Sequence, residues 1–143
     1  PLMIDKIHLL LEQYQAFDFV KVQSFDSKIL DLFHAKDQRF RISKLIVYNI
    51  GLGDKTKFYY DEKFRTGNLF SIDYLEGINT SQRYVNQRLI KRVHDANKEI
   101  YCWTANQHRT MKRLIRLGVD GIITNYPDKL KLLLLENSIS PNK

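Results

Sequence analysis

The sequence predicts an α/β fold in which parallel strands alternate with helices. Short apolar runs rich in β-branched residues, at 45–48 and 121–124 for example, alternate with segments whose apolar residues recur every three or four positions. Several of these runs are apolar throughout, which is typical of parallel strands covered on both faces. The length of 143 residues suits about one domain. No internal repeat or low-complexity tract is found in the sequence.

The N-terminal part of the chain predicts two helices and two strands. Apolar residues at helical spacing predict a first helix that ends near Tyr14. Residues 19–23 predict a short strand, and a polar residue after it can cap the second helix. Residues 45–48 predict the next buried strand. The candidates for the cap are Ser24, Asp26 and Ser27.

A long polar and aromatic stretch comes next, at about 49–80. It holds four of the six glycines and shows little periodicity beyond a short strand near 72–75. Because this is long for a connection between a strand and a helix, we expect an insert, a lid or a specificity loop. Its mixed cations and aromatic residues fit a surface excursion with its own small cluster. The functional alternative is a contact with a phospholipid headgroup, a teichoic-acid-like polymer or a membrane surface. These residues are Lys55, Lys57, Phe58, Tyr59, Tyr60, Lys63, Phe64 and Arg65.

Residues with special backbone properties set the helix ends in the last third of the chain. Asn97 and Gly118 can adopt the left-handed conformation that closes a helix. Asn106 can cap the helix that Gly118 closes, and Pro127 can open the last helix, where its missing N–H costs nothing. The elements so bounded are helices that start at 80–81, 106 and 127, and strands at 99–104 and 121–124.

Composition excludes several classes of protein. With 43% hydrophobic residues the chain can bury a core, so general disorder is excluded. The single cysteine, Cys102, cannot form an internal disulfide or a thiolate metal cluster. The longest aliphatic run, 132–135, is far shorter than a membrane span, and the N-terminus has no signal-peptide pattern. Because position 1 is not methionine, we expect the chain to be a piece of a longer protein. We expect that protein to be cytoplasmic or membrane-associated.

The net charge of +7 leaves two interpretations open. It fits a solvated basic surface, and it fits a partner that carries phosphate. The sequence has no helix-turn-helix, zinc or RNA-binding signature, so we expect no nucleic-acid partner.

The turns that leave the predicted strands are expected to lie on one face of the sheet, since parallel strands all end there. They are residues 23–26, 48–51, 103–106 and 124–127. Trp103 stands at a strand end where valine or isoleucine is more usual, and it either lines a pocket or fills the interior of a barrel. The small polar residues of these turns can also be ordinary helix caps.

Three segments, in this order, resemble the glycerophosphodiester phosphodiesterase family. Residues 20–26 (VKVQSFD) resemble its strand with a Ser-Phe motif, and residues 89–106 resemble its helix, turn and Trp-Thr-x-Asn strand end. Residues 117–127 (LGVDGIITNYP) resemble its closing signature. Asn97 and Asn125 stand where that family more often has Gly and Asp, and residues 49–79 match only loosely.

The resemblance implies a TIM (β/α)₈ barrel of which residues 1–143 form the C-terminal half, since a complete barrel needs roughly 250 residues. It implies hydrolysis of glycerophosphodiesters to glycerol 3-phosphate and an alcohol, with a divalent metal (Ca²⁺ or Mg²⁺) held by carboxylates and two histidines that transfer protons. The family places these groups after its first four strands, and this chain resembles only the C-terminal half of the family's domain. The residues carried over as lining of the substrate pocket are Ser24, Phe25, Trp103, Thr104 and Asn106.

We therefore expect no catalytic residue and no metal ligand in this chain, and no diesterase activity from the chain alone. It contains no Glu-x-Asp pair. The His-Arg and His-Asp pairs at His108 and His94 fall on predicted helices rather than at strand ends, as do His8 and His34.

Half a barrel leaves two sheet edges unpaired. We expect the chain to pair with the missing N-terminal half or to self-associate, unless it is a proteolytic remainder. The alternative is a non-catalytic half-barrel module that binds anionic lipid or another phosphate-bearing partner. The coding sequence upstream of Pro1 distinguishes the two: His-Arg-Gly and Glu-x-Asp motifs favour the enzyme.

Overall fold

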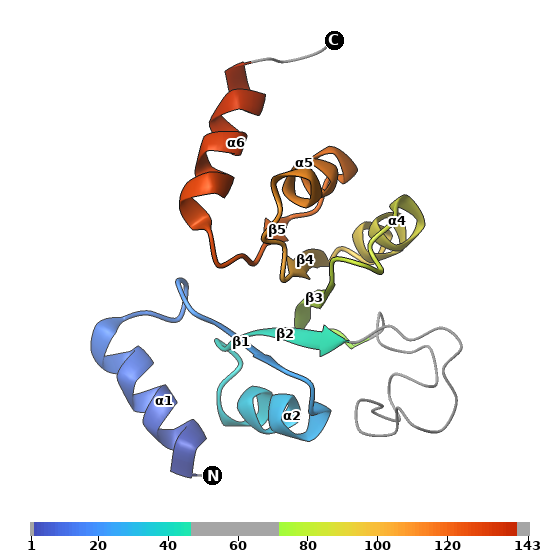
Figure 1. The fold of residues 1–143 in the computed structure, drawn as a ribbon. Coiled ribbons are helices and arrows are strands. Elements are labelled where there is room, and N and C mark those ends of the chain that lie inside the picture. The colour runs from blue at the N-terminus through green and yellow to red at the C-terminus, as the bar shows by residue number, and fades with distance from the viewer. Residues whose placement is uncertain (1, 47–71, 140–143) are drawn as a thin grey trace, which may run out of the picture.

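The computed structural model describes residues 2–46 and 72–139. They form one five-stranded sheet with helices packed along its outer side (Figure 1). The helices are α1 (Leu2–Tyr14), α2 (Ser27–Lys36), α4 (Gln87–Asp95), α5 (His108–Leu117) and α6 (Pro127–Ile139). The strands are β1 (Lys21–Ser24), β2 (Arg41–Ile46), β3 (Leu75–Ser81), β4 (Glu99–Trp103) and β5 (Gly121–Ile122).

The sheet is parallel throughout, and its strands lie in chain order from β1 to β5. A register shift between Ile42 and Ser43 interrupts the pairing of β2 with β3. The predicted α/β fold with a parallel sheet is therefore confirmed. No helix in the described ranges has the length and apolar character to cross a bilayer.

Several predicted element ends are confirmed. α1 ends at Tyr14 and α6 begins at Pro127. Asn97 and Gly118 have φ angles of 54° and 79° and close the helices before them, as their tolerance of this conformation predicts. Of the three candidate caps for α2, Asp26 is the one used, since its side chain accepts a hydrogen bond from the Lys28 N–H at 2.8 Å.

The expectation of a loop up to residue 80 and of a helix from Thr80 or Ser81 is wrong. Residues 75–81 form strand β3, in place of the short strand expected near 72–75. The next helix starts at Gln87, where the Asn86 side chain caps it by accepting from the Leu89 N–H at 3.0 Å. Pairing with β2 and β4 stabilises a strand that has little apolar character of its own. The rest of the expected insert, with its cations and aromatic residues and the turn at 48–51, lies outside the described residues.

The other four strands also differ at their ends from the prediction, β4 only in ending at Trp103 rather than at residue 104. β2 begins at Arg41 rather than at residue 45, and β1 covers 21–24 rather than 19–23. β5 ends at Ile122 and not at Thr124. Polar residues extend the strands where a neighbouring strand offers hydrogen-bonding partners. Phe19 was expected to begin the first strand, but it lies before β1 and is 88% exposed.

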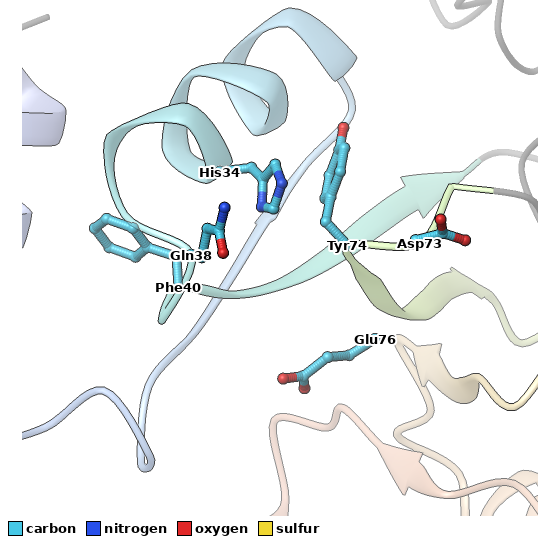
Figure 2. Close-up of a pocket in the computed structure, with 6 residues that line it drawn as sticks. All are labelled: His34, Gln38, Phe40, Asp73, Tyr74 and Glu76. Carbon is cyan, nitrogen blue, oxygen red and sulfur yellow. The ribbon is translucent and has the colours of Figure 1, made fainter.

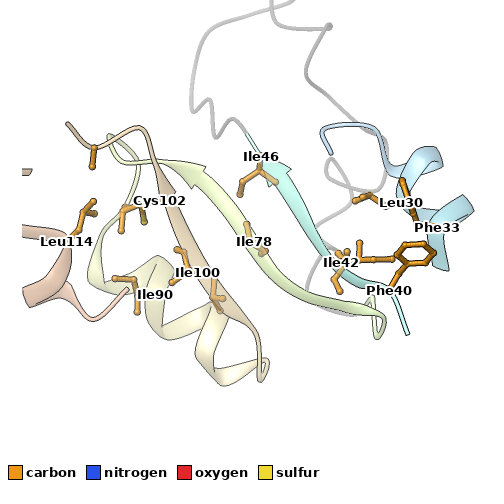
Figure 3. Close-up of a cluster of buried hydrophobic side chains, with 14 of the residues drawn as sticks. Leu30, Phe33, Phe40, Ile42, Ile46, Ile78, Ile90, Ile100, Cys102 and Leu114 are labelled. Atoms are coloured by element: carbon orange, nitrogen blue, oxygen red, sulfur yellow. The ribbon is translucent and has the colours of Figure 1, made fainter. Parts of the chain in front are cut away.

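The hydrophobic core lies between the outer face of the sheet and the helices (Figure 3). Ile42 packs near Leu30 and Phe33 of α2, and Phe33 contacts Phe40 edge-on at 4.9 Å between ring centroids. Farther along the sheet, Ile100 lies by Ile90 of α4. The outward apolar residues of β2, β3 and β4 thus belong to one core with the helices.

The inner face of the sheet is polar near the end where the strands begin. Lys21 of β1 pairs with Glu76 of β3 at 3.0 Å and with Glu99 of β4, which places these three side chains on one face. Gln23 and Asn79 also meet across this face, at 2.5 Å. Burial alone would lower the pKa of Lys21, but its bonds to the two glutamates raise it above its usual value. Charge pairing therefore stabilises the end of the inner face where the strands begin.

Cys102 points into the core and should be chemically inert in the folded chain. Burial raises the pKa of its thiol to about 12, so almost no thiolate is present near neutral pH. We expect iodoacetamide at about pH 8 to alkylate it rapidly in denaturing urea and only slowly in buffer. Equal rates in the two conditions would show that the thiol is accessible in the fold.

Candidate functional site

The candidate site lies where the strands end. Since the five strands are parallel, the segments after β1, β3, β4 and β5 emerge at the same edge of the sheet. All five residues predicted to line a pocket lie at this edge, and four of them take part in two separate contacts. The aromatic pair lies on the inner side, and a polar cavity lies by the start of α5.

Phe25 and Trp103 are brought together across the sheet. Their ring centroids are 6.0 Å apart and their planes are nearly perpendicular, at 87°. Such an edge-to-face contact stabilises the pair beyond the area that it buries. Trp103 continues the series Glu99, Tyr101 on the inner face of β4, and the Phe25 side chain remains 37% exposed. The indole N–H of Trp103 is buried and has no hydrogen-bond partner among the described residues.

A buried lysine fixes the backbone of Phe25. Lys44 is only 2% exposed, and its ammonium group donates a hydrogen bond to the Phe25 carbonyl oxygen. This ties the turn after β1 to β2 and so helps to position the Phe25 ring. Lys44 was not predicted from the sequence. The available signal was a lone lysine within the otherwise buried stretch from Ile42 to Ile46.

The sequence predicted Asn106 as the cap of α5, and this prediction is wrong. The cap position is Gln107, which makes no side-chain capping bond. The Asn106 side-chain oxygen instead accepts hydrogen bonds from the Asn125 N–H at 2.9 Å and from the Thr124 hydroxyl at 3.3 Å. It therefore joins the turn after β4 to the turn after β5. A side-chain amide can either cap a helix or connect two turns, and here it connects two turns.

A cavity of about 330 Å³ opens between the loops after β3 and β4. All six lining side chains are polar, one of them cationic: Gln82, Arg83, Thr104, Asn106, Gln107 and Thr110. The predicted residues Thr104 and Asn106 thus share one cavity. Its lining suits a polar or anionic group rather than an apolar one.

Arg113 of α5 holds the β3 side of this cavity in place. Its guanidinium donates to the carbonyl oxygens of Gln82 at 2.5 Å and Val85 at 3.0 Å. The Gln82 N–H donates in turn to the Trp103 carbonyl oxygen at 2.8 Å. The loop after β3 is therefore fixed to both β4 and α5. Gln82, Arg83 and Arg113 were not predicted from the sequence because strand β3 was not found there.

Ser24 lies apart from the other predicted residues. It pairs in register with Lys44, so that by strand alternation it belongs to the face opposite Trp103. Its hydroxyl accepts a hydrogen bond from the Asp26 N–H at 3.0 Å and forms the turn that leads into α2. In this arrangement the Ser24 hydroxyl shapes the turn that carries Phe25.

A second cavity, of about 550 Å³, lies at the opposite edge of the sheet (Figure 2). In it the rings of His34 and Tyr74 stack at 4.5 Å between centroids, and Glu76 is bound by Lys21 and Arg41. This cavity adjoins the beginnings of β2 and β3, whereas active sites of βα barrels lie where the strands end. We therefore place the candidate site at the aromatic pair and the smaller cavity.

One described group has donor atoms close enough to hold a metal ion. His8, Glu12 and Asp37 each offer a ligand atom, all within 4.8 Å of one another. The Arg39 guanidinium, however, binds both carboxylates, at 2.7 Å for Asp37, and its hydrogen bonds hold the pKa of Asp37 well below its usual value. A dication would have to displace this arginine, and the group lies before β2, away from the strand ends. It does not fit a catalytic metal.

The four histidines lie on helices, as predicted. His8 and His34 belong to α1 and α2, and His108 opens α5. His94 of α4 pairs with Asp120 at 2.9 Å. None of the four reaches the aromatic pair or lines the smaller cavity.

Several known proteins are similar to this chain. Residues 5–129 match the family model "Glycerophosphoryl diester phosphodiesterase family". The dermonecrotic toxin Hl-PLD1 of Hemiscorpius lepturus is 30% identical over 93% of this chain and 42% of its own length. Glycerophosphodiester phosphodiesterase GDPD4 of Arabidopsis thaliana is 36% identical over 50 residues, which are 35% of this chain and 15% of the plant protein.

The fold is also found among solved structures. A structure from Silicibacter pomeroyi DSS-3, assigned as a glycerophosphoryl diester phosphodiesterase, superimposes with a TM-score of 0.75 at 20% identity and covers 94% of this chain and 43% of its own. The chain thus spans less than half the length of these proteins, and its sheet corresponds to part of a TIM barrel wall. With the family model matched over residues 5–129, the chain belongs to the glycerophosphoryl diester phosphodiesterase family.

Proposed function

We propose that residues 1–143 are the C-terminal part of a phosphodiesterase domain that hydrolyses glycerophosphodiesters to glycerol 3-phosphate and an alcohol. The observation that carries this proposal is the Phe25–Trp103 contact, because both residues lie in segments that resemble motifs of the family, within the matched residues 5–129, and meet where the parallel strands end. A closed barrel of eight strands would need three strands beyond the five described here.

In this proposal the chain supplies the wall of the pocket. Phe25 and Trp103 contact the carbon skeleton of the glycerol or of the alcohol, and the unpartnered indole N–H offers one hydrogen bond to a substrate oxygen. Thr104 and Asn106 provide the polar side, and Ser24 shapes the turn that carries Phe25. The chain binds and orients the substrate through these groups.

The proton-transferring histidines and the metal-binding carboxylates are proposed to lie in the other part of the domain. A divalent ion, Ca²⁺ or Mg²⁺, would supply charge neutralisation at the phosphate when bound. The one donor group found among the described residues, His8 with Glu12 and Asp37, is held by Arg39 and does not fit that role. The isolated chain is therefore proposed to be inactive.

The test compares the 143-residue chain with a longer protein that contains the coding sequence upstream of Pro1. With glycerophosphocholine and Mg²⁺ or Ca²⁺, we expect no release of glycerol 3-phosphate from the chain alone. We expect release from the longer protein, which a chelator should abolish. Hydrolysis by the purified chain alone would contradict the proposal that the catalytic groups lie in the other part of the domain.

The same experiment decides whether the chain is instead a non-catalytic module for anionic lipid. An upstream sequence without His-Arg-Gly and Glu-x-Asp motifs, together with an inactive longer protein, would favour the module. We also propose that the chain pairs with the missing barrel half or with itself, because apolar side chains such as Leu9 and Leu132 are 65% and 62% exposed on α1 and α6. A monomer by light scattering at tens of micromolar would count against self-association.

A further inference from the structure

The positive charge of this chain is concentrated in one segment. Residues 83–117 contain nine lysines and arginines against two acids, a net charge of +7. The remaining residues carry fourteen basic and fourteen acidic side chains, so their net charge is zero. The whole excess charge therefore belongs to α4, α5 and the short segments beside them.

Two of the nine basic residues in this segment have structural roles. Arg113 binds the carbonyl oxygens of Gln82 and Val85. Lys98 is 8% exposed and donates to the carbonyl oxygens of Ile72 and Leu75 at 2.9 and 2.7 Å. Both side chains are used inside the fold and add little to a binding surface.

Six of the remaining cations are exposed on two consecutive helices of the outer layer, α4 and α5 (Figure 1). We call these six side chains the basic face: Arg88, Lys91, Arg92, Arg109, Lys112 and Arg116. Of the segment's two acids, only Asp95 contacts the basic face. Asp95 pairs with Lys91 at 2.8 Å, and Glu99 pairs with Lys21 on the inner face of the sheet. Asp120, just beyond the segment, binds His94 and the Ile100 N–H.

We propose that the basic face docks the protein on an anionic phospholipid bilayer. Exposed cations spread over two helices match a surface of negative headgroups, to which each basic residue contributes about 1 kcal/mol. The choice of a bilayer over a nucleic acid rests on the proposed function, because glycerophosphodiesters have the structure of phospholipids without their acyl chains. The smaller cavity is lined by Arg83 from the loop after β3 and by Gln107 and Thr110 at the start of α5, so it lies next to this face. Docking there would bring the candidate site close to the lipid surface.

The test measures binding of the 143-residue chain to vesicles by co-sedimentation. We expect binding to phosphatidylcholine vesicles that contain about 30% phosphatidylglycerol, no binding to pure phosphatidylcholine, and loss of binding as salt is raised. The triple variant Arg109→Gln, Lys112→Gln, Arg116→Gln removes the α5 part of the basic face. It should bind on the order of 100-fold more weakly.

A matched control removes the same charge from the other helices. The variant Lys6→Gln, Lys129→Gln, Lys131→Gln changes three exposed lysines of α1 and α6 and should bind within about threefold of the unaltered chain. Circular dichroism checks that both variants fold. Equal weakening by the two variants would overturn the proposal, since net charge alone would then explain binding. Salt-sensitive binding to RNA without binding to anionic vesicles would overturn it in favour of a nucleic-acid partner. This experiment measures binding and not hydrolysis. A failure to bind vesicles would therefore not contradict the proposed diesterase reaction, which the hydrolysis assay tests separately.

Discussion

Replacement of Gly77 by valine should destabilise the chain by about 3 kcal/mol or more. A Cβ at this position would lie 2.7 Å from the carbonyl oxygen of Glu99 and 3.2 Å from its Cβ. Gly77 and Glu99 are paired in register between β3 and β4, so the clash is with a neighbouring strand and cannot be relieved by a side-chain rotation. Urea unfolding monitored by circular dichroism measures the change in the free energy of unfolding.

Gly118 provides the matched control, because it tests conformation without packing. A Cβ there would meet nothing within 4 Å, but its φ of 79° is unfavourable for any residue with a side chain. Gly118→Ala should therefore cost only about 1–2 kcal/mol. If Gly77→Val remained within about 1 kcal/mol of the unaltered chain, the close approach of β3 and β4 would be wrong.

Replacement of Trp103 by alanine in the longer, active protein should lower kcat/KM by about 10- to 100-fold. The substitution removes the edge-to-face contact with Phe25 and the buried indole donor from the proposed pocket wall. A loss of one aromatic wall and one hydrogen bond is worth about 1.4–2.8 kcal/mol of transition-state stabilisation. Steady-state hydrolysis of glycerophosphocholine measures it, and Phe25→Ala should act in the same direction.

Tyr126→Ala is the control for the loss of an aromatic ring at the same edge. Tyr126 is 43% exposed and stacks against the Lys129 ammonium at 4.0 Å. Since this tyrosine has no part in the proposed wall, its removal should change kcat/KM by less than about threefold. Unchanged kinetics for Trp103→Ala, with the protein folded, would remove Trp103 from the pocket.

Part of the candidate site could be predicted from local sequence. The Ser-Phe turn and the Trp-Thr-x-Asn strand end could be placed at one edge because parallel strands all end on the same side. The contact between Phe25 and Trp103 could not be derived, since β2 and β3 lie between their strands in the sheet. Lys44 and Arg113 were missed for a similar reason: each acts through a bond to the backbone of a residue far away in sequence.

The sequence by itself determined the elements that depend on local chemistry. Asn97 and Gly118 closed helices because their backbone tolerates a positive φ, and Pro127 opened one because the first turn needs no N–H donor. The tertiary structure alone decided β3 and the first half of β2. Their inward residues include Arg41 and Asn79, which face the inner side of the sheet and bind the side chains of Glu76 and Gln23 from other strands. Such strands have few apolar residues to reveal them in the sequence, since part of their stability comes from hydrogen bonds and ion pairs that exist only after the sheet has formed.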